Sequence, residues 1–422
     1  MSVANRRPIS IQAGESTLSR AAWLTLIAAF LGWMFDGMEQ GIFPLVARPA
    51  LRELLAVDGD QLIGLWMGRL TAVFLIGAAF GGLVFGWLGD KVGRVRAMSL
   101  SILVYSAFTG ACYFAAEPWQ LAAFRFVAAL GMGGEWSLGV ALVMETWPSR
   151  HRPWLAGAIG ASSNIGFLAI GGLGYLVPIT AHSWRWVMLV GAAPAALTFF
   201  VRLFVPESER WRQAVAQKES RPLQEIFSAP LLRRTIIAIT LASIALIGTW
   251  GSVQWIPLWA DKLTNGTMPA AKALTQILIA GGAIVGCIGG AVGARSGRRR
   301  AFAVLCAASF ASCAVLFRFV THYGPAFLIF SFLIGAFTAA FYGWFPLYLP
   351  ELFPTRVRAT AQGISYNSGR LLAAAGAVGA GRLVEFYDGN YARMGAIITL
   401  VYLFGLGIIW LAPETKGRPL PE

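Results

Sequence analysis

The chain alternates between long apolar segments and short polar ones. Most apolar segments run for about 20 residues or more, the length that an α-helix needs to cross a bilayer. Charged and turn-forming residues gather between these segments, where each helix is expected to end. The pattern predicts twelve transmembrane helices, at about residues 22–47, 62–88, 97–116, 119–144, 154–178, 184–205, 233–258, 273–293, 301–321, 325–349, 359–386 and 391–412.

The composition agrees with this pattern and argues against a set of soluble domains. Of the 422 residues, 57% are hydrophobic and 13% are charged, against about 45–50% and about 25% in soluble domains. A soluble protein this apolar would have too few polar side chains to cover its surface. We therefore expect an all-α, multi-pass integral membrane protein, located in the cell or inner membrane.

The surplus of positive charge has a topological explanation. The chain has 34 Lys and Arg against 20 Asp and Glu, a net charge of +14. Twelve spans place both termini on one side of the membrane, and 22 of the 34 cations fall on that side against 7 on the other. Lys and Arg mark cytoplasmic loops, so we expect both termini in the cytoplasm. A basic patch for anionic lipid is the alternative. Nucleic-acid binding is not expected, because little of the chain can be exposed.

Three motifs occur twice, in the same order, at a spacing of about 205 residues. The pairs are residues 86–96 with 290–300, residues 145–152 with 351–358, and residues 206–208 with 413–415. The repeating unit is therefore six helices, used twice. We predict two pseudo-symmetric six-helix bundles, residues 1–205 and 233–422, joined by a cytoplasmic linker at 206–232. Parallel repeats of this kind place a binding site between the bundles.

The repeated motifs resemble those of the major facilitator superfamily, and the resemblance covers essentially the whole chain. Residues 86–96 match the signature loop between the second and third spans of that family. Residues 206–211 and 413–417 look like sugar-porter signatures. Asp36-Gly37-Met38-Glu39 and Tyr366-Asn367-x-Gly369-Arg370 are more similar to metabolite, aromatic-acid and sialic-acid proton symporters. The resemblance implies a twelve-helix transporter that works by alternating access.

The family ascribes a gating role to the signature loop. Asp90 stands among basic residues at helix ends, where charge-assisted hydrogen bonds can latch two helices in one conformation and release them in another. The second copy has Ala294 in place of the acid, so we expect a weaker latch there. The alternative is that the loop only sets topology. The predicted gating residues are Gly86, Asp90, Lys91, Gly93, Arg94, Glu145, Arg152, Arg295, Arg298, Glu351 and Arg358.

Acids inside the first bundle are candidates for proton coupling. An ionisable residue deep in a span costs roughly 3 kcal/mol on insertion scales, so it indicates function. Asp36 and Glu39 are three residues apart and share one helix face. Two neighbouring buried carboxylates cannot both ionise cheaply, so one is expected to carry a proton. We predict Asp36, Glu39 and Glu135 as proton-coupling residues, and the sugar-porter resemblance pairs Asp36 with Arg125. A static ion-pair network is the alternative.

Cations in both bundles are candidates for binding a substrate carboxylate, because a guanidinium donates two parallel hydrogen bonds to one. We expect Arg69 and Arg125 to meet the two acids of the first span around one polar pocket. The second bundle has no deep acid, so it is expected to contact substrate and not protons. Its preferred aromatic pair is Trp255 and Tyr342. The predicted substrate-binding residues are Arg69, Arg125, Gln254, Trp255, Tyr342, Asn367 and Arg370.

The leading hypothesis is proton-driven import of a small organic anion, a carboxylate, by a monomer that needs no cofactor. The three histidines lack metal-ligand spacing, and the Gly-rich stretches open no phosphate-binding unit, so we expect neither a metal site nor an enzyme. The nearest alternative is a proton-coupled sugar or polyol porter of the same fold. An exporter is disfavoured because the fifth span has no Gly-Pro pair. A non-transporting sensor or scaffold is the alternative of another class.

Overall fold

The computed structural model describes residues 20–56, 60–176, 183–217, 221–264, 268–387 and 390–421. Within these ranges the chain forms helices and turns, with no β-strand. The first 19 residues, and residues 218–220 of the predicted linker, lie outside the described ranges. The all-α fold class predicted from the apolar pattern is therefore confirmed.

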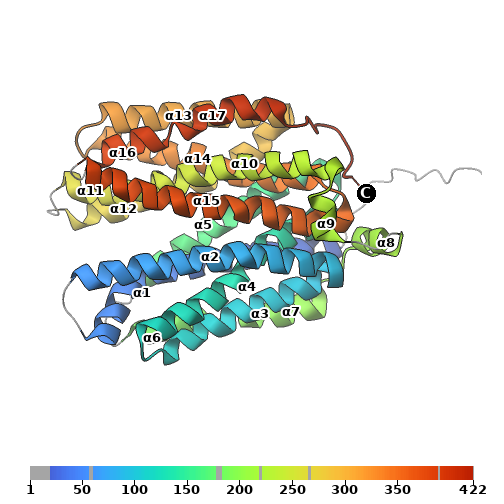
Figure 1. Ribbon diagram of the computed structural model, residues 1–422, viewed down its shortest axis with the longest axis horizontal. Helices are drawn as coiled ribbons and strands as arrows, with labels where there is room; N and C mark the ends of the chain where they lie inside the picture. The colour runs from blue at the N-terminus through green and yellow to red at the C-terminus, as the bar shows by residue number, and fades with distance from the viewer. Residues whose placement is uncertain are drawn as a thin grey trace, which may run out of the picture.

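Within the described residues the first half of the chain forms seven helices, most of them in the lower part of Figure 1, with α5 at mid-height. They are α1 (Arg20–Leu55), α2 (Asp60–Val92), α3 (Arg94–Ala111), α4 (Pro118–Thr146), α5 (Arg152–Leu176), α6 (Trp184–Val190) and α7 (Ala195–Phe204). Short 3₁₀ turns, η1 (Cys112–Phe114) and η2 (Ser149–His151), extend α3 and precede α5. The predicted sixth span is thus two short helices separated by a turn.

The second half forms the upper group of helices in Figure 1. They are α10 (Ala229–Gly251), α11 (Ile256–Leu263), α12 (Pro269–Gly293), α13 (Arg298–Phe319), α14 (Pro325–Leu352), α15 (Arg358–Phe386), α16 (Tyr391–Ile398) and α17 (Val401–Ile408). Four 3₁₀ turns, η3 (Val253–Trp255), η4 (Ala294–Ser296), η5 (Thr355–Val357) and η6 (Ile409–Leu411), link or end them.

Ten stretches of the described chain are long and apolar enough to cross a membrane. The α6–α7 stretch and α15 complete the predicted twelve. α15 is long enough to span but has polar side chains along it, including Gln362, Asn367 and Arg370. A span that tolerates such residues is expected to face protein or a cavity and not lipid.

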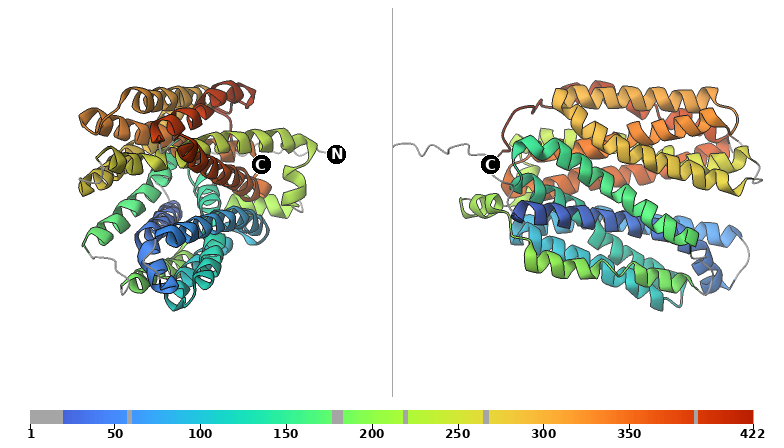
Figure 2. Two further views of the ribbon diagram at one scale, coloured as in Figure 1. Left: turned by 60° about the vertical axis from the view of Figure 1, so that its left-hand side comes forward. Right: turned by 180° about the vertical axis from the view of Figure 1, so that it is seen from behind.

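The linker forms α8 (Glu209–Gln217) and α9 (Pro222–Ile226), which lie at the same end of the molecule as residue 421. We call this end the linker end; it is at the right in Figure 1 and at the left of the rear view in Figure 2. Two helices of the first half pack against the second half. Helix α2 packs against α15, and helix α5 packs against α12 and α14. The division of the chain at residues 205 and 232 stays a prediction.

Glycines bring the two halves together. Apolar helices gain little from leaving lipid, so association depends on close packing of small residues. A Cβ on Gly363 of α15 would overlap the Gly82 carbonyl oxygen of α2, and a Cβ on Gly160 of α5 would lie 2.5 Å from the Tyr342 carbonyl oxygen of α14. These positions admit only glycine at the present separation, so the seam between the halves is close-packed.

The repeated motifs build the same turn twice. Gly93 and Gly297 have φ angles of 110° and 144°, a region that favours glycine, and each is the N-cap of the following helix. Glu207 accepts a hydrogen bond from the Arg94 backbone N–H at 2.9 Å, and Glu414 accepts one from the Arg298 N–H at 3.0 Å. The glutamate of each Pro-Glu-Ser/Thr motif therefore caps a helix of its own half.

Candidate functional site

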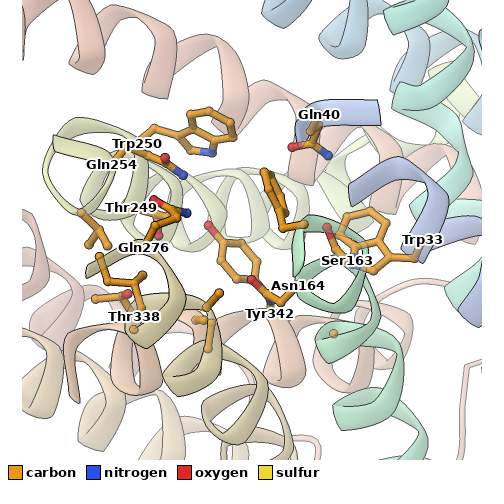
Figure 3. Close-up of a pocket in the computed structure, with 18 of the residues that line it drawn as sticks. Trp33, Gln40, Ser163, Asn164, Thr249, Trp250, Gln254, Gln276, Thr338 and Tyr342 are labelled. Carbon is orange, nitrogen blue, oxygen red and sulfur yellow. The ribbon is translucent and has the colours of Figure 1, made fainter. Parts of the chain in front are cut away.

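A cavity of about 120 Å³ lies between the two halves. Figure 3 shows side chains from both sides entering it, with Trp33 and Gln40 of α1 opposite Trp250 and Tyr342. Amide and hydroxyl groups make up most of its polar lining, from Gln40, Ser163, Asn164, Thr249, Gln254, Gln276 and Thr338. A group the size of a water molecule needs about 10–15 Å³ of such space, so this cavity is large enough for a small metabolite.

Stacked aromatic rings form part of the cavity wall. Tyr366 of α15 stacks on Trp136 of α4 with centroids 4.4 Å apart, and Trp33 lies against both rings at 6.4 and 5.9 Å. Trp33 and Tyr366 line the cavity, whereas Trp136 lies behind them. All three are at most 5% exposed. The contact joins a helix of each half.

Arg370 is the only charged side chain among the residues that line this cavity. It is 6% exposed, and its guanidinium lies 5.2 Å from the centroid of the Tyr366 ring. Its Nη1 donates a hydrogen bond to Asn367 Oδ1 at 3.0 Å. A buried guanidinium without a carboxylate in hydrogen-bond contact is a strong anion-binding group. The cavity can therefore hold one negative charge.

Asp36 and Glu135 form a buried acidic pair beside the cavity. They are 0% and 2% exposed, and none of their four carboxyl oxygens accepts a hydrogen bond from an N–H or hydroxyl group, although the two carboxyls lie within hydrogen-bonding reach of each other. The two carboxyls interact electrostatically with each other, and Asp36 also interacts with Arg370. Gly32 makes room for the pair, because a Cβ there would overlap the Glu135 carboxyl. The cation that faces the cavity and the unpaired acids are thus neighbours.

Glu39 has a different environment from Asp36, although both lie on α1. Its Oε1 accepts a hydrogen bond from Arg125 Nη1 at 2.5 Å, in an ion pair whose side chains are 1% and 2% exposed. The Arg125 guanidinium lies between the rings of Phe43 and Phe74, at 4.5 and 4.7 Å. Arg125 therefore pairs with Glu39, which corrects the expected Asp36–Arg125 pairing.

Four of the seven predicted substrate residues do not line the cavity. Arg69 is exposed, and its guanidinium lies 5.1 Å from the centroid of the Trp66 ring, so it does not join the acids of α1. Trp255 lies in the 3₁₀ turn η3 and packs against Tyr391, with ring centroids 6.3 Å apart. Arg125 is held by Glu39. Of the predicted set, Gln254, Tyr342 and Arg370 line the cavity, and Asn367 lies behind Arg370.

The signature loop joins the two halves at the linker end. Asp90 accepts a hydrogen bond from Arg94 Nη1 at 2.6 Å, and it also accepts the backbone N–H groups of Ala359 and Thr360, at 3.2 and 2.8 Å. The latter two groups begin α15, where the helix dipole favours a negative charge. Asp90 therefore caps a helix of the opposite half. A Cβ on Gly86 would lie 2.8 Å from the Ala359 carbonyl oxygen, so Gly86 permits this approach.

Glu145 extends the same network. Its Oε1 accepts hydrogen bonds from Arg94 Nη2 of the first half and Arg358 Nη1 of the second, at 3.2 and 2.9 Å, and all three side chains are buried. Arg94 also donates to the Thr355 carbonyl oxygen at 2.6 Å, and Arg358 to that of Pro421 at 2.8 Å. We call these contacts of Asp90, Arg94, Glu145 and Arg358 the linker-end network. It closes this end of the molecule.

The hydrogen bonds of the second copy of the motif stay within its own half. Arg298 donates two hydrogen bonds to Glu351, at 2.9 and 2.7 Å, and Glu351 also accepts one from Thr415 at 2.6 Å. Ala294 has no carboxyl to reach across the seam. This arrangement agrees with the weaker second latch expected from the sequence.

The other predicted gating residues surround these contacts. Arg152 of α5 is buried and interacts electrostatically with Glu351 of the second half. Lys91 and Arg295 are exposed, and Gly93 supplies the turn before α3. Among the residues the structure describes, no cluster of three or more His, Cys, Asp or Glu could hold a metal ion.

Sequence reasoning missed several cavity residues. Gln40, Asn164, Trp250 and Gln276 all line the cavity. A polar side chain such as Asn164 inside an otherwise apolar span is the sequence feature that could have indicated a cavity residue. For Trp250 no such signal exists, because most aromatic residues of a membrane protein face lipid or pack between helices.

Comparison with known proteins gives the same picture over the whole chain. The family model described as Major Facilitator Superfamily matches residues 22–288, and that described as Sugar (and other) transporter matches residues 218–422. The chain is 31% identical over 412 residues to a protein of Haemophilus influenzae named for metabolite transport, covering 94% of this chain and 98% of that one. It is 28% identical to the cis,cis-muconate transport protein of Acinetobacter baylyi, covering 94% and 95%.

Solved structures show the same fold. The proton:xylose symporter XylE bound to 6-bromo-6-deoxy-D-glucose superposes with a TM-score of 0.78 at 17% identity, covering 96% of this chain and 98% of that one. The human organic anion transporter MFSD10 has a TM-score of 0.69 at 18% identity, covering 93% and 100%. All four of these proteins are named for transport or symport.

Proposed function

The chain belongs to the Major Facilitator Superfamily of membrane transporters, and on that basis we propose that it imports a small organic anion, a carboxylate, together with protons. The observation that carries the proposal is Arg370, the single charged side chain lining a cavity between the two halves. The transport proteins for cis,cis-muconate and niacin, which are 28% and 25% identical to this chain, support an organic acid as substrate.

Coupling to protons follows from the position of the acidic pair. Two unpaired buried carboxylates close together cannot both be ionised at low cost, so Asp36 and Glu135 together hold at least one proton in this conformation. Arg370 interacts electrostatically with Asp36. A substrate carboxylate that engages Arg370 competes for that positive charge. Binding of the anion then favours uptake of a proton by Asp36 and Glu135. Anion and proton would therefore be transported together in the same direction.

Alternating access needs a closed end and an open end. The linker-end network closes one end of the seam, and the excess of Lys and Arg places that end in the cytoplasm. The structure then corresponds to the outward-facing half of the cycle, and both termini are cytoplasmic. Each chain contains both halves and a complete cavity, so a monomer suffices, and the proton gradient replaces a cofactor as the source of energy.

Uptake into proteoliposomes tests the proposal. With benzoate as the probe, an inside-alkaline pH gradient is expected to accelerate uptake by the wild type. Arg370→Gln should abolish uptake, and Asp36→Asn should leave uptake that no longer responds to the gradient. A matched control is Arg382→Gln, because Arg382 lies on the same helix but is exposed. Uptake that ignores both a protonophore and the Asp36 substitution would rule out proton coupling.

A sugar or polyol porter is the second candidate. The amides of Gln40, Asn164, Gln254 and Gln276 line the cavity and suit hydroxyl groups, and a sugar-transporter model matches the second half. Arg370→Gln separates the candidates, because it should remove binding of an anion but only weaken that of a neutral sugar. A wild type that takes up xylitol or xylose but not benzoate would favour this candidate.

A further inference from the structure

Asn367 lies at the seam, one step behind the cavity. It is 2% exposed, and its Nδ2 donates hydrogen bonds to the Gly133 carbonyl oxygen of α4 at 3.1 Å and to that of Gly363 at 2.9 Å. Its Oδ1 accepts the hydrogen bond from Arg370 Nη1 at 3.0 Å. Asn367 does not line the cavity. It therefore contacts the substrate-facing cation with one atom and the opposite half with another.

The packing around Asn367 fixes its orientation. A Cβ on Gly82 of α2 would overlap the Asn367 amide, so that side chain fills the space left by the glycine. The bond from Nδ2 to Gly133 can form only while α15 is packed against α2 and α4. Because a buried N–H without an acceptor is costly, loss of this bond weakens the packed state.

We propose that Asn367 is a positioning residue that couples Arg370 to closure of the linker end. Arg370 holds the Asn367 carbonyl oxygen, which keeps the amide aimed at Gly133 and α15 packed against the first half. A carboxylate that draws Arg370 toward the cavity releases the amide and loosens the seam. Release of the Asn367 amide by a substrate carboxylate rests on the proposed function. The effect of Arg370 and Asn367 on closure of the linker end does not require a ligand.

The link can be measured in ligand-free protein. Spin labels are placed on Arg96→Cys and Arg300→Cys, exposed positions near the starts of α3 and α13. Double electron–electron resonance between these labels reports the distance between the halves at the linker end. Labels on Glu117→Cys and His322→Cys report the opposite end. The four native cysteines are buried and compete little for label. The variants are Asn367→Ala, Gly82→Ala, Arg370→Ala and the double variant of Asn367 and Arg370.

Asn367→Ala and Gly82→Ala are expected to raise the open-to-closed ratio at the linker end about fivefold, the effect of one buried hydrogen bond. Gly289→Ala is the matched control, because a Cβ there meets nothing within 4 Å. Arg370→Ala should shift the ratio in the same direction, and the double variant should shift it no further than Asn367→Ala alone.

Two results would overturn the proposal. One is a wild-type distance distribution in both Asn367→Ala and Gly82→Ala. The other is additive shifts from Asn367→Ala and Arg370→Ala, which would mean that the two residues act separately. Asn367→Asp provides a test if the alanine variant does not fold, since it keeps the size and the acceptor oxygen but removes both N–H donors. These outcomes do not depend on whether benzoate is transported.

Discussion

Glu39 Oε1 lies 2.5 Å from Arg125 Nη1 in a fully buried ion pair, while Asp36, one helical turn earlier on α1, has no cation in hydrogen-bond contact and lies against Glu135. The two acids therefore play different parts. Glu39 neutralises a cation that the fold has buried between two phenylalanine rings. Asp36 remains available to a proton and to Arg370.

The first prediction separates these roles by stability. Glu39→Gln leaves a buried guanidinium without a counter-charge, which typically costs about 3–5 kcal/mol. Asp36→Asn replaces one member of a buried pair of carboxyls that has no cation in hydrogen-bond contact, so we expect its thermal unfolding temperature to equal or exceed that of the wild type. Thermal unfolding of the purified protein in one detergent at neutral pH measures both. The double variant Glu39→Gln, Arg125→Met should recover most of the loss, and an Asp36→Asn protein less stable than Glu39→Gln would contradict the assignment.

Sequence patterns could place both acids on one face of the first span but could not choose between them. Asp36 and Glu39 are separated by one turn, so a small rotation of α4 about its axis decides which of them Arg125 reaches. No periodicity within α1 or α4 specifies that rotation. It depends on side-chain packing across the bundle, in which Gly32, Phe43 and Phe74 take part.

The second prediction concerns the linker-end network. Glu145 joins Arg94 of the first half to Arg358 of the second, whereas Glu351 pairs with Arg298 of its own half. Glu145→Gln should therefore increase the distance between labels on Arg96→Cys and Arg300→Cys in a substantial fraction of molecules. Double electron–electron resonance on the ligand-free protein measures this distance.

The internal repeat supplies the control for this variant. Glu351→Gln is the equivalent change in the second half. Because the hydrogen bonds of Glu351 stay within that half, this variant should lower the unfolding temperature but change the label distance less than Glu145→Gln does. Equal shifts of the label distance in the two variants would argue against a gate that is specific to the first copy. The repeat could be predicted from sequence because its motifs recur in order. The Pro421 carbonyl that Arg358 reaches could not be predicted, because a backbone acceptor has no residue signature.

The third prediction uses two tryptophans of the second half. Trp250 lines the cavity, whereas Trp255, five residues later, packs against Tyr391. Trp250→Ala should weaken binding of an aromatic acid such as benzoate by about 2–10-fold, the range expected for one lost ring contact. Trp255→Ala should leave the affinity unchanged. Isothermal titration calorimetry of each variant with benzoate measures the two affinities. An unchanged affinity in Trp250→Ala combined with a weaker affinity in Trp255→Ala would show that Trp255, and not Trp250, contacts the ligand.

The fourth prediction concerns the two glutamates that cap α3 and α13. Burial raises the pKa of Glu207 above its usual value, despite the backbone N–H groups that it accepts. Burial acts in the same direction on Glu414, but backbone N–H groups, among them those of Arg298 and Arg299, outweigh it and lower its pKa. As the pH falls, Glu207 is therefore protonated first. Because its folded pKa lies above its ordinary value, that protonation favours the folded start of α3, whereas protonation of Glu414 weakens the α13 cap.

Hydrogen exchange resolved to single amides measures this difference. Protection factors remove the intrinsic effect of pH on exchange, so a lost cap appears as falling protection at the helix start. The Arg298 and Arg299 amides, which Glu414 accepts, should lose protection as the pH falls, whereas the Arg94 and Val95 amides, which Glu207 accepts, should keep or gain it. The sign agrees with linkage: the stabilisation by Glu414 is present above its unfolded pKa and is lost only as the pH falls through its lower folded pKa. Glu207→Gln should make protection of the Arg94 amide independent of pH, and simultaneous loss at both helices would show that the two caps titrate alike.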